Sequence, residues 1–262
     1  MNVEDLEKAL QQLRLMKPLV LCLTNHVTMD FMANCLLSLG AAPIMSEDVR
    51  EADELAQLCQ AVYVNIGTLD DEFMARASSG IELAHAYQKP VIIDPVGAGA
   101  TKIRTQSARS LLAHAEIVRG NASEIMALHD DHAKTLGVDS SHQVNDALHS
   151  AISLATTYQC VVVVSGARDF VTDGKQQAFL EFGSPLMPYV TGMGCAMTAV
   201  IAAFRAVIPN AYDAARAGTA YYSLCGSLAA YTTDHPGAFR TAFIDELYAA
   251  NFELMKDVIH AD

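Results

Sequence analysis

The pattern with the clearest chemical potential in this sequence is a glycine turn at residues 191–195, TGMGC, that leads at once into an apolar helical segment. Gly192 and Gly194 allow neighbouring backbone N–H groups to point toward one place, and the dipole of the following helix adds partial positive charge there. Such a place suits a phosphoryl group. The spacing matches neither a dinucleotide fingerprint nor a Walker A loop, because no Lys-Ser/Thr pair follows. A plain tight turn is therefore the alternative.

A carboxylate stands at the end of another apolar run, where a glycine-rich loop begins. Asp94 follows Val-Ile-Ile at 91–93, and Gly97 and Gly99 come soon after it. Its carboxylate could face phosphates through a magnesium ion, because Mg²⁺ prefers oxygen ligands. Glycines in such a loop indicate close approach of a ligand. We favour this role over that of a simple turn-forming Asp-Pro.

Two further polar residues have the spacing of a helix cap. Asn121 and Glu124 match a capping box with Asn in the capping role, and by spacing alone capping is the favoured interpretation of both. The alternative is that Glu124 orders magnesium-bound water beside the phosphate site. Arg119 follows a predicted strand just before them, and its guanidinium could bind phosphate. A surface salt bridge is the alternative for Arg119.

Polar residues follow several other apolar runs in the same way. In an open parallel sheet, ligands bind where the strands end at their carboxyl side. Besides Asp94 and its loop, such positions are 24–26 (TNH), 65–68 (NIGT), 119–121 (RGN) and 165–166 (SG). His129 and His132 form an HxxH pattern, but we predict no metal site there, because no further ligand is nearby in the sequence.

The elements that must position these residues alternate along the chain. Short β-branched or apolar runs are expected to form strands at 19–23, 42–45, 61–64, 91–93, 116–118 and 160–164. Helical patterns lie between most of them, at 28–39, 50–60, 70–88, 104–113, 123–129 and 143–158. This order predicts βαβ units and an α/β fold, with a mostly parallel central sheet flanked by helices on both faces.

The alternation of predicted strands and helices ends after residue 164. Runs at 170–172 and 176–182 flank Asp173-Gly174, a dipeptide that favours a tight hairpin turn and hence an antiparallel edge on the sheet. Three helices are then expected, at 195–207, 211–231 and 239–260, separated by Pro209 and by Pro236-Gly237. No linker, repeat or low-complexity tract divides the chain, so we predict one domain over residues 1–262.

The composition of the chain indicates which binding partners and which cellular compartment to expect. The chain has 262 residues, 17 basic and 30 acidic side chains and a formal net charge of −13, so nucleic acid is not an expected partner. Its longest apolar stretch, 196–204, ends at Arg205 and is too short to span a bilayer, and no membrane partner is expected. The first residues lack the basic start and apolar middle of a signal peptide. Six cysteines without a CxxC pair favour the reducing cytoplasm.

Taken together, these segments are similar to those of the hydroxyethylthiazole kinase family, within the ribokinase-like superfamily. The similarity runs from about residue 18 to residue 247 and rests on CLTNHVTMDFMANCLLSLGAAPIM, NIGTL, DPVGAGA, RGNASEI, VVVVSGARDFVTDG, TGMGCAMTAVIAAF and GAFRTAFIDEL. The resemblance implies a ribokinase-like fold and ATP- and Mg²⁺-dependent phosphorylation of the hydroxyethyl group of 4-methyl-5-(2-hydroxyethyl)thiazole, in thiamine biosynthesis or salvage. It also implies a homotrimer in which a neighbouring subunit completes each thiazole site.

The resemblance assigns substrate-binding roles position by position. Met45 and Gly192 match thiazole-binding positions of the family. Asn25, Val27 and Gly67 match positions that line the same pocket.

The same resemblance assigns the nucleotide and metal sites. Arg119 and Ser165 match ATP-binding positions, and Asp94 and Glu124 match acidic residues that organise magnesium and its water. Cys195 stands where the wider superfamily has a catalytic Asp, although cysteine is the usual occupant in thiazole kinases. A helix N-terminus lowers the pKa of a thiol from its usual value of about 8.5, so Cys195 could assist as a modest base. Simple orientation of the alcohol is an equal alternative.

Two other functions fit part of this pattern. The first is a ribokinase-like kinase for another small heteroaromatic alcohol, such as a pyrimidine or pyridoxal-type substrate, although Met45 and Val27 favour a small and rather apolar ring. The second is a nucleotide-binding or regulatory protein without turnover. The intact Asp94, Glu124 and glycine turn argue against that second function.

Overall fold

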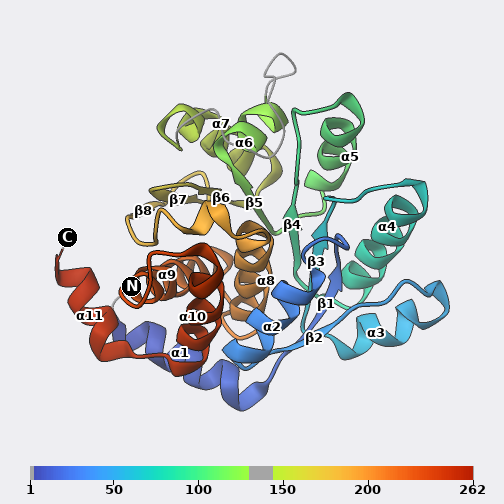
Figure 1. The fold of residues 1–262 in the computed structure, drawn as a ribbon. Helices are drawn as coiled ribbons and strands as arrows, with labels where there is room; N and C mark the ends of the chain where they lie inside the picture. The colour runs from blue at the N-terminus through green and yellow to red at the C-terminus, as the bar shows by residue number, and fades with distance from the viewer. Residues whose placement is uncertain (1–2, 130–143, 262) are drawn as a thin grey trace.

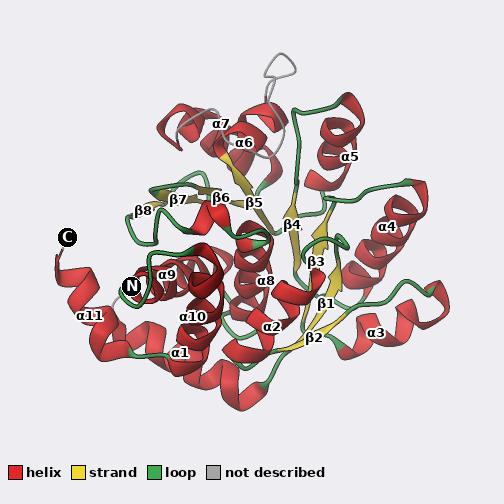
Figure 2. Ribbon diagram, in the orientation of Figure 1, coloured by secondary structure: helices red, strands yellow, loops and turns green. Residues whose placement is uncertain are grey.

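A sheet of eight strands lies at the centre of the computed structural model, which describes residues 3–129 and 144–261 (Figures 1 and 2). In chain order the strands are β1 Leu19–Leu23, β2 Ala42–Ile44, β3 Ala61–Asn65, β4 Val91–Asp94, β5 Ile117–Asn121, β6 Val161–Ser165, β7 Asp169–Thr172 and β8 Gln177–Leu180. Their spatial order is β2-β1-β3-β4-β5-β6-β7-β8. The strands from β2 to β6 pair in parallel, whereas β7 and β8 pair antiparallel at one edge. The predicted mostly parallel sheet and its antiparallel edge are therefore confirmed.

Helices cover both faces of this sheet, as predicted (Figure 1). One face carries α1 Val3–Met16, α2 Met29–Leu39, α8 Met193–Arg205, α9 Ala211–Ala230, α10 Pro236–Ala249 and α11 Phe252–Ala261. The other face carries α3 Ala52–Leu58, α4 Asp71–Ala86, α5 Lys102–Leu112, α6 Ala122–His129 and α7 Val144–Tyr158. Short 3-10 turns at Val49–Glu51 and Met187–Tyr189 come before α3 and α8.

Alternating strand residues build two separate cores. In β3, Tyr63 packs into the core on the α8 side, whereas Val62 and Val64 pack into the core on the α4 side. Successive side chains of a strand point to opposite faces, so a strand covered on both sides needs apolar residues throughout. This requirement explains the nearly continuous apolar runs in the sequence. The same alternation decides which polar residues at the strand ends face α8.

The observed end of one strand and the observed start of one helix differ from the predicted ones, and both changes concern functional residues. The pairing of β5 with β6 continues to Asn121 and Ser165, so Arg119 lies within β5, opposite Val163, and not after the strand. The helix predicted from residue 195 begins earlier, at Met193, because Gly192 has a left-handed backbone (φ 97°) and caps it. Gly194 and Cys195 therefore belong to the first turn of α8.

The prediction of one helix over 239–260 is wrong. Ala250 has a left-handed backbone (φ 50°) and ends α10, and Asn251 Oδ1 accepts a hydrogen bond from Leu254 N (3.3 Å) at the start of α11. An asparagine that can cap a new helix was the available sequence signal. Pro236, predicted as part of a separator, is instead the first residue of α10, a position that proline tolerates.

Other predictions concern membrane and metal contacts. Across residues 3–129 and 144–261, no helix combines the length and the apolar character that a membrane span requires. That part of the chain also holds no group of three or more His, Cys, Asp or Glu side chains placed to bind a metal ion. His129 packs edge-on against His149, with 5.6 Å between the ring centroids, and His132 lies outside the described residues.

Candidate active site

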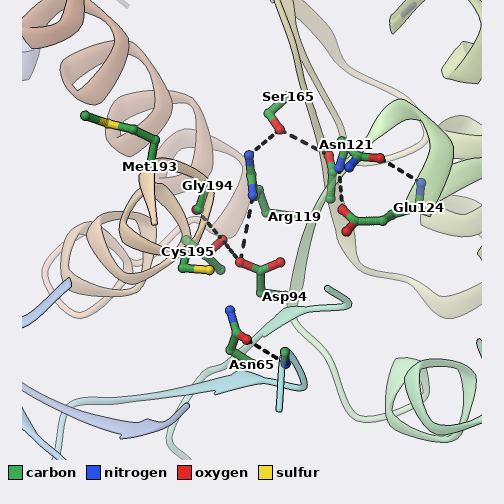
Figure 3. Close-up of polar contacts among 12 residues, drawn as sticks. Asn65, Asp94, Arg119, Asn121, Glu124, Ser165, Met193, Gly194 and Cys195 are labelled. Carbon is green, nitrogen blue, oxygen red and sulfur yellow. Dashed lines mark hydrogen bonds and ion pairs between the residues drawn. The ribbon is translucent and has the colours of Figure 1, made fainter. Parts of the chain in front are cut away.

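Four polar residues lie together at the carboxyl ends of neighbouring strands, on the face that α8 covers (Figure 3). They are Asn65, Asp94, Arg119 and Ser165. Each follows, by two positions, a strand residue of the α8-side core, so strand alternation turns all four side chains to the same face. The parallel register sets Asn65 beside Asp94 across β3 and β4. Residues selected from separate strand ends thus form one cluster.

Arg119 links Ser165 of β6 to Asp94 of β4. Its guanidinium is buried, Nη2 donates a hydrogen bond to Ser165 Oγ, and Nη1 lies 3.8 Å from Asp94 Oδ2. Its Nε has no hydrogen-bond partner among the described residues. A buried cation with an unused donor is costly unless a ligand satisfies it. The arrangement therefore suits an anionic ligand such as a phosphate.

The first turn of α8 lies directly against this guanidinium. A Cβ added at Gly194 would lie 2.5 Å from Arg119 Nη1, so a larger residue cannot fit unless the arginine moves. The hydrogen bond from Ala196 N to Gly192 O (2.8 Å) is the first of the helix, and the N–H groups of Gly194 and Cys195 precede it. The positive end of the helix dipole and the arginine charge therefore act at the same point.

Asp94 is fully buried beside Arg119. Its Oδ2 accepts a hydrogen bond from Thr198 Oγ1 of α8 (2.8 Å), whereas Oδ1 has no hydrogen-bond partner in the described part of the chain. Burial raises the pKa of Asp94, and the charge of Arg119 opposes that shift. A buried carboxylate oxygen without a partner fits coordination of a divalent cation.

Glu124 makes the capping box that its spacing indicates. Asn121 Oδ1 accepts a hydrogen bond from Glu124 N (2.9 Å), and Glu124 Oε2 accepts one from Asn121 N (2.8 Å). The other oxygen, Oε1, accepts from Gly97 N (2.8 Å) and ties the loop after Asp94 to α6. Burial, followed by the charge of Asp94, raises the pKa of Glu124 to about 7. Capping is therefore confirmed, and it is compatible with a role beside a cation, since each oxygen can accept a second interaction.

The electrostatic expectation for Cys195 is wrong. Burial and the nearby Asp94 raise the pKa of its thiol, although we expected the helix start to lower it. The thiol is therefore neutral near pH 7. Asn25 Nδ2 donates to Cys195 Sγ (3.5 Å) and also to Asn65 Oδ1 (2.9 Å). These contacts orient the sulfur without ionising it.

Three of the residues expected to line the thiazole pocket belong to this cluster. Asn25 contacts Asn65, and Asn65 Oδ1 also accepts a hydrogen bond from Gly67 N (2.9 Å). Gly192 lies against Thr28, where an added Cβ would be 3.1 Å from Thr28 Cβ. Thr28 in turn donates from its backbone N and its hydroxyl to Asn25 Oδ1. Asn25, Asn65 and Thr28 thus form one hydrogen-bonded network with Cys195, and the backbone of Gly67 and Gly192 lies against it.

The other two expected pocket residues, Met45 and Val27, have different surroundings. Met45 borders a cavity of about 200 Å³, between the ends of β1 and β2 and helix α4, whose lining includes Leu23 and Phe73. Neither Asp94 nor Cys195 lines this cavity. Val27 is 69% exposed in the turn before α2. Within one chain, therefore, Met45 borders this cavity, and Val27 is exposed to solvent between Asn25 and Thr28 of the network.

Two residues of this neighbourhood were not identified from the sequence. Thr198 holds Asp94, but it is a small residue inside an apolar helical run and carried no signal of its own. Asp169 is buried at the start of β7, where it accepts hydrogen bonds from Gly166 N (3.0 Å) and Ser223 Oγ (2.8 Å). It thereby fixes the loop that follows Ser165. A charged residue next to an apolar strand run was the signal for Asp169.

Comparison with known proteins identifies the family. A model described as the Hydroxyethylthiazole kinase family matches residues 10–253. The chain belongs to this family. A hydroxyethylthiazole kinase from Chlamydia caviae is 52% identical over 256 residues, which cover 97% of this chain and 98% of the relative. One from Oleidesulfovibrio alaskensis is 43% identical and covers 92% of this chain and 91% of the relative. Membership of the hydroxyethylthiazole kinase family makes the chain a phosphotransferase.

Solved structures agree on the fold. The structure of a hydroxyethylthiazole kinase protein from Pyrococcus horikoshii has a TM-score of 0.87 at 33% identity and covers 94% of this chain and 93% of that one. A pyridoxal kinase from Staphylococcus aureus has a TM-score of 0.62 at 17% identity, covering 80% of this chain and 88% of that one. At this low identity only the fold is shared. A ribokinase-like superfamily protein from Enterococcus faecalis has a TM-score of 0.67 at 14% identity and covers 94% of both chains, so the ribokinase-like fold that the resemblance implies is confirmed.

The contact between Gly194 and Arg119 generates a test. We expect Gly194→Ala to raise the KM for ATP and to lower kcat/KM by roughly 10- to 100-fold, because the added methyl group displaces the guanidinium. Steady-state kinetics below the melting temperature measure this effect. Gly237→Ala is the matched control, since a Cβ there meets nothing within 4 Å. Wild-type kinetics for Gly194→Ala would show that the guanidinium position is unimportant.

Burial of Asp169 predicts a pH-dependent stability. Its pKa is raised by burial to about 6 in the folded protein, against roughly 4 in an unfolded chain. Folding therefore favours the protonated form, and the stability that it contributes is present below pH ~4 and is lost as the pH rises through ~6. Asp169→Asn has no such titration. Its free energy of unfolding should gain up to about 3 kcal/mol relative to wild type between pH ~4 and ~7.

Denaturant unfolding at several pH values measures this difference for Asp169→Asn, with the exposed Asp71→Asn as a control. A gap between Asp169→Asn and wild type that stays constant across the pH range would contradict the raised pKa.

Proposed function

We propose that this member of the family, acting as one kinase domain over residues 1–262, catalyses ATP- and Mg²⁺-dependent phosphorylation of the hydroxyethyl group of 4-methyl-5-(2-hydroxyethyl)thiazole, in thiamine biosynthesis or salvage. The observation that carries the proposal is the position of Arg119, which joins Ser165 to Asp94 against the first turn of α8. Phosphoryl transfer depends on positioning and charge stabilisation more than on covalent chemistry. The buried Arg119 and the N-terminus of α8, which lie together, supply both positioning and charge stabilisation.

The nucleotide would bind on the Arg119 side of the cluster. Arg119 and Ser165 would bind ATP, and the N–H groups of Gly194 and Cys195 would hold the γ-phosphoryl group. The left-handed conformation of Gly192 supports this, because it starts the helix where those N–H groups remain open to a ligand. Arg119 would then stabilise the negative charge that develops on the transferring group.

The acidic residues fit a magnesium ion by the chemistry of their donors. Asp94 Oδ1 is a buried oxygen without a hydrogen-bond partner among the described residues, and the charge of Asp94 acts on Glu124. Mg²⁺ commonly binds through one or two carboxylates together with water and substrate phosphates, so no larger acidic cluster is needed. Asp94 would hold the ion and Glu124 would hold its water. When bound, magnesium would offset charge on the β and γ phosphates.

The alcohol would approach Cys195. Because the pKa of this thiol is raised, we propose that Cys195 orients the hydroxyl group and does not act as a base. A loose transition state does not require early deprotonation of the alcohol, so a neutral thiol at this position is compatible with turnover. Asn25, which contacts the sulfur, would keep it in place.

The thiazole ring would extend toward Met45 and Val27. We propose that a neighbouring subunit of a homotrimer covers these residues and completes the pocket, with Gly67 and Gly192 lining its near side. The exposure of Val27 and the open cavity beside Met45 support this proposal.

We also propose a cytoplasmic location. The six cysteines of the chain are all free, and five of them are buried, which favours a reducing compartment.

An ADP-release assay with purified protein, ATP, Mg²⁺ and the thiazole alcohol tests the function. We expect ADP release to require both the alcohol and Mg²⁺, and mass spectrometry to find the thiazole monophosphate. Asp94→Asn should lower turnover by roughly 100-fold or more, because it removes charge opposite the phosphates, while the exposed Asp71→Asn should not. Equal ADP release without the thiazole alcohol, or faster release with pyridoxal, would contradict this substrate assignment.

The shared site predicts that assembly and activity are lost together. Sedimentation should give about three times the chain mass of 28.1 kDa. Val27→Asp should shift the protein toward monomers and lower turnover in parallel, because a buried charge opposes the contact. Leu15→Asp, at an even more exposed apolar residue on α1, is the control. A monomer with full activity is incompatible with a shared thiazole site.

A further inference from the structure

Arg104, on the first turn of α5, binds the backbone of two loops at once. Its Nη1 donates hydrogen bonds to Ile66 O (3.1 Å) and Val96 O (2.9 Å), and its Nη2 donates to Gly67 O (2.9 Å). Ile66 and Gly67 follow β3, whereas Val96 follows β4. A planar guanidinium can satisfy several carbonyl groups in one fixed geometry, which a flexible ammonium group cannot do. Arg104 therefore links the two loops.

Each of these loops carries a different part of the site. The backbone N of Gly67 donates to Asn65, which also binds the Asn25 side chain that contacts Cys195. In the other loop, the backbone N of Gly97 donates to Glu124. The loop after β3 thus contacts the residues beside Cys195, where the alcohol would bind, and this part of the site is called the alcohol side. The loop after β4 contacts Glu124, and this part is called the acidic side.

The stem of Arg104 packs closely on the second loop. Gly97 has a left-handed backbone (φ 79°), and an added Cβ would lie 2.9 Å from Arg104 Cδ. The start of α5 is itself held to this loop, because Gly99 N donates to Thr105 Oγ1 (2.8 Å) and Thr101 Oγ1 caps the helix by accepting from Arg104 N (3.3 Å). Arg104 thus projects from a support that is anchored to the loop after β4.

We propose that Arg104 is a positioning residue that aligns the alcohol side of the active site with its acidic side. This inference rests on the proposed kinase function for its kinetic consequence. In-line phosphoryl transfer requires both reactants in a narrow range of positions, and a shift of about 1 Å can cost roughly 100-fold in rate. Arg104 touches neither reactant and acts through the carbonyl groups of the two loops.

The same helix offers a matched control. Arg109 also donates from α5 to two backbone carbonyls, with Nε to Leu128 O (3.1 Å) and Nη2 to Ala127 O (2.8 Å). Those carbonyls lie in the last turn of α6, at the end opposite Glu124. Arg109→Lys therefore removes the same kind of contact without touching either loop.

The kinetic test compares Arg104→Lys with Arg109→Lys. Lysine keeps the charge but cannot span Gly67 O and Val96 O in the same geometry. We expect Arg104→Lys to raise the KM for the thiazole alcohol and to lower kcat/KM at least tenfold, measured well below the melting temperature. Arg109→Lys should stay within twofold of wild type, even if its melting temperature falls equally. Equal kinetic effects of the two substitutions would overturn the proposal.

Hydrogen exchange provides a readout that does not depend on the substrate assignment. Exchange of the amides in 66–68 and in 96–98 should accelerate together in Arg104→Lys and in Arg104→Gln, and should be unchanged in Arg109→Lys. Acceleration in only one loop, or in neither, would overturn the proposed alignment whatever the activity. If the wild-type protein does not phosphorylate the thiazole alcohol, but the variants show the expected exchange pattern, the proposed substrate is refuted. The proposed role of Arg104 is then still supported.

Discussion

The charge balance around the buried Asp94 is the constraint on which the site depends. Its carboxylate is held by Arg119 from β5 and by Thr198 from α8, so the electrostatics link two strands of the sheet to the helix that covers them. Removing one partner of a buried ion pair leaves an uncompensated charge and is strongly destabilising. Burial raises the pKa of Asp94 and that of its neighbour Glu124, although the charge of Arg119 opposes both shifts. A cation bound beside these two carboxyl groups would favour the ionised form of both.

Much of this site could be predicted because its geometry follows from periodic patterns. Apolar runs that end in a polar residue gave the strand ends at Asn65, Asp94 and Ser165, and parallel pairing brings such ends to one edge. The side on which they meet also follows from strand alternation, since each lies two positions after a residue of the α8-side core. Glu124 could be predicted as a cap from local spacing alone.

What could not be predicted depends on contacts between distant segments. The rise in the pKa of Cys195 comes from burial and from Asp94, which lies far away in the sequence, and these outweigh the local effect of the helix start. Arg104 and Asp169 bind backbone groups whose positions are set by tertiary structure, so their residue types gave no clue to their partners. The break at Ala250 was missed because apolar residues continue on both sides of it, and only Asn251 marks the new start.

The close contact between Gly194 and Arg119 also has an evolutionary consequence. Because the space over Gly194 is filled by the guanidinium, a side chain at residue 194 can be accommodated only if Arg119 moves. A mutation that enlarges residue 194 therefore displaces the buried positive charge, whereas a shorter residue at position 119 would make room for the larger side chain but would remove that charge. The effects of substitutions at the two positions are therefore not expected to add. Evolutionary change at either position therefore moves or removes the arginine charge, even though the contact requires nothing more than the absence of a methyl group at residue 194.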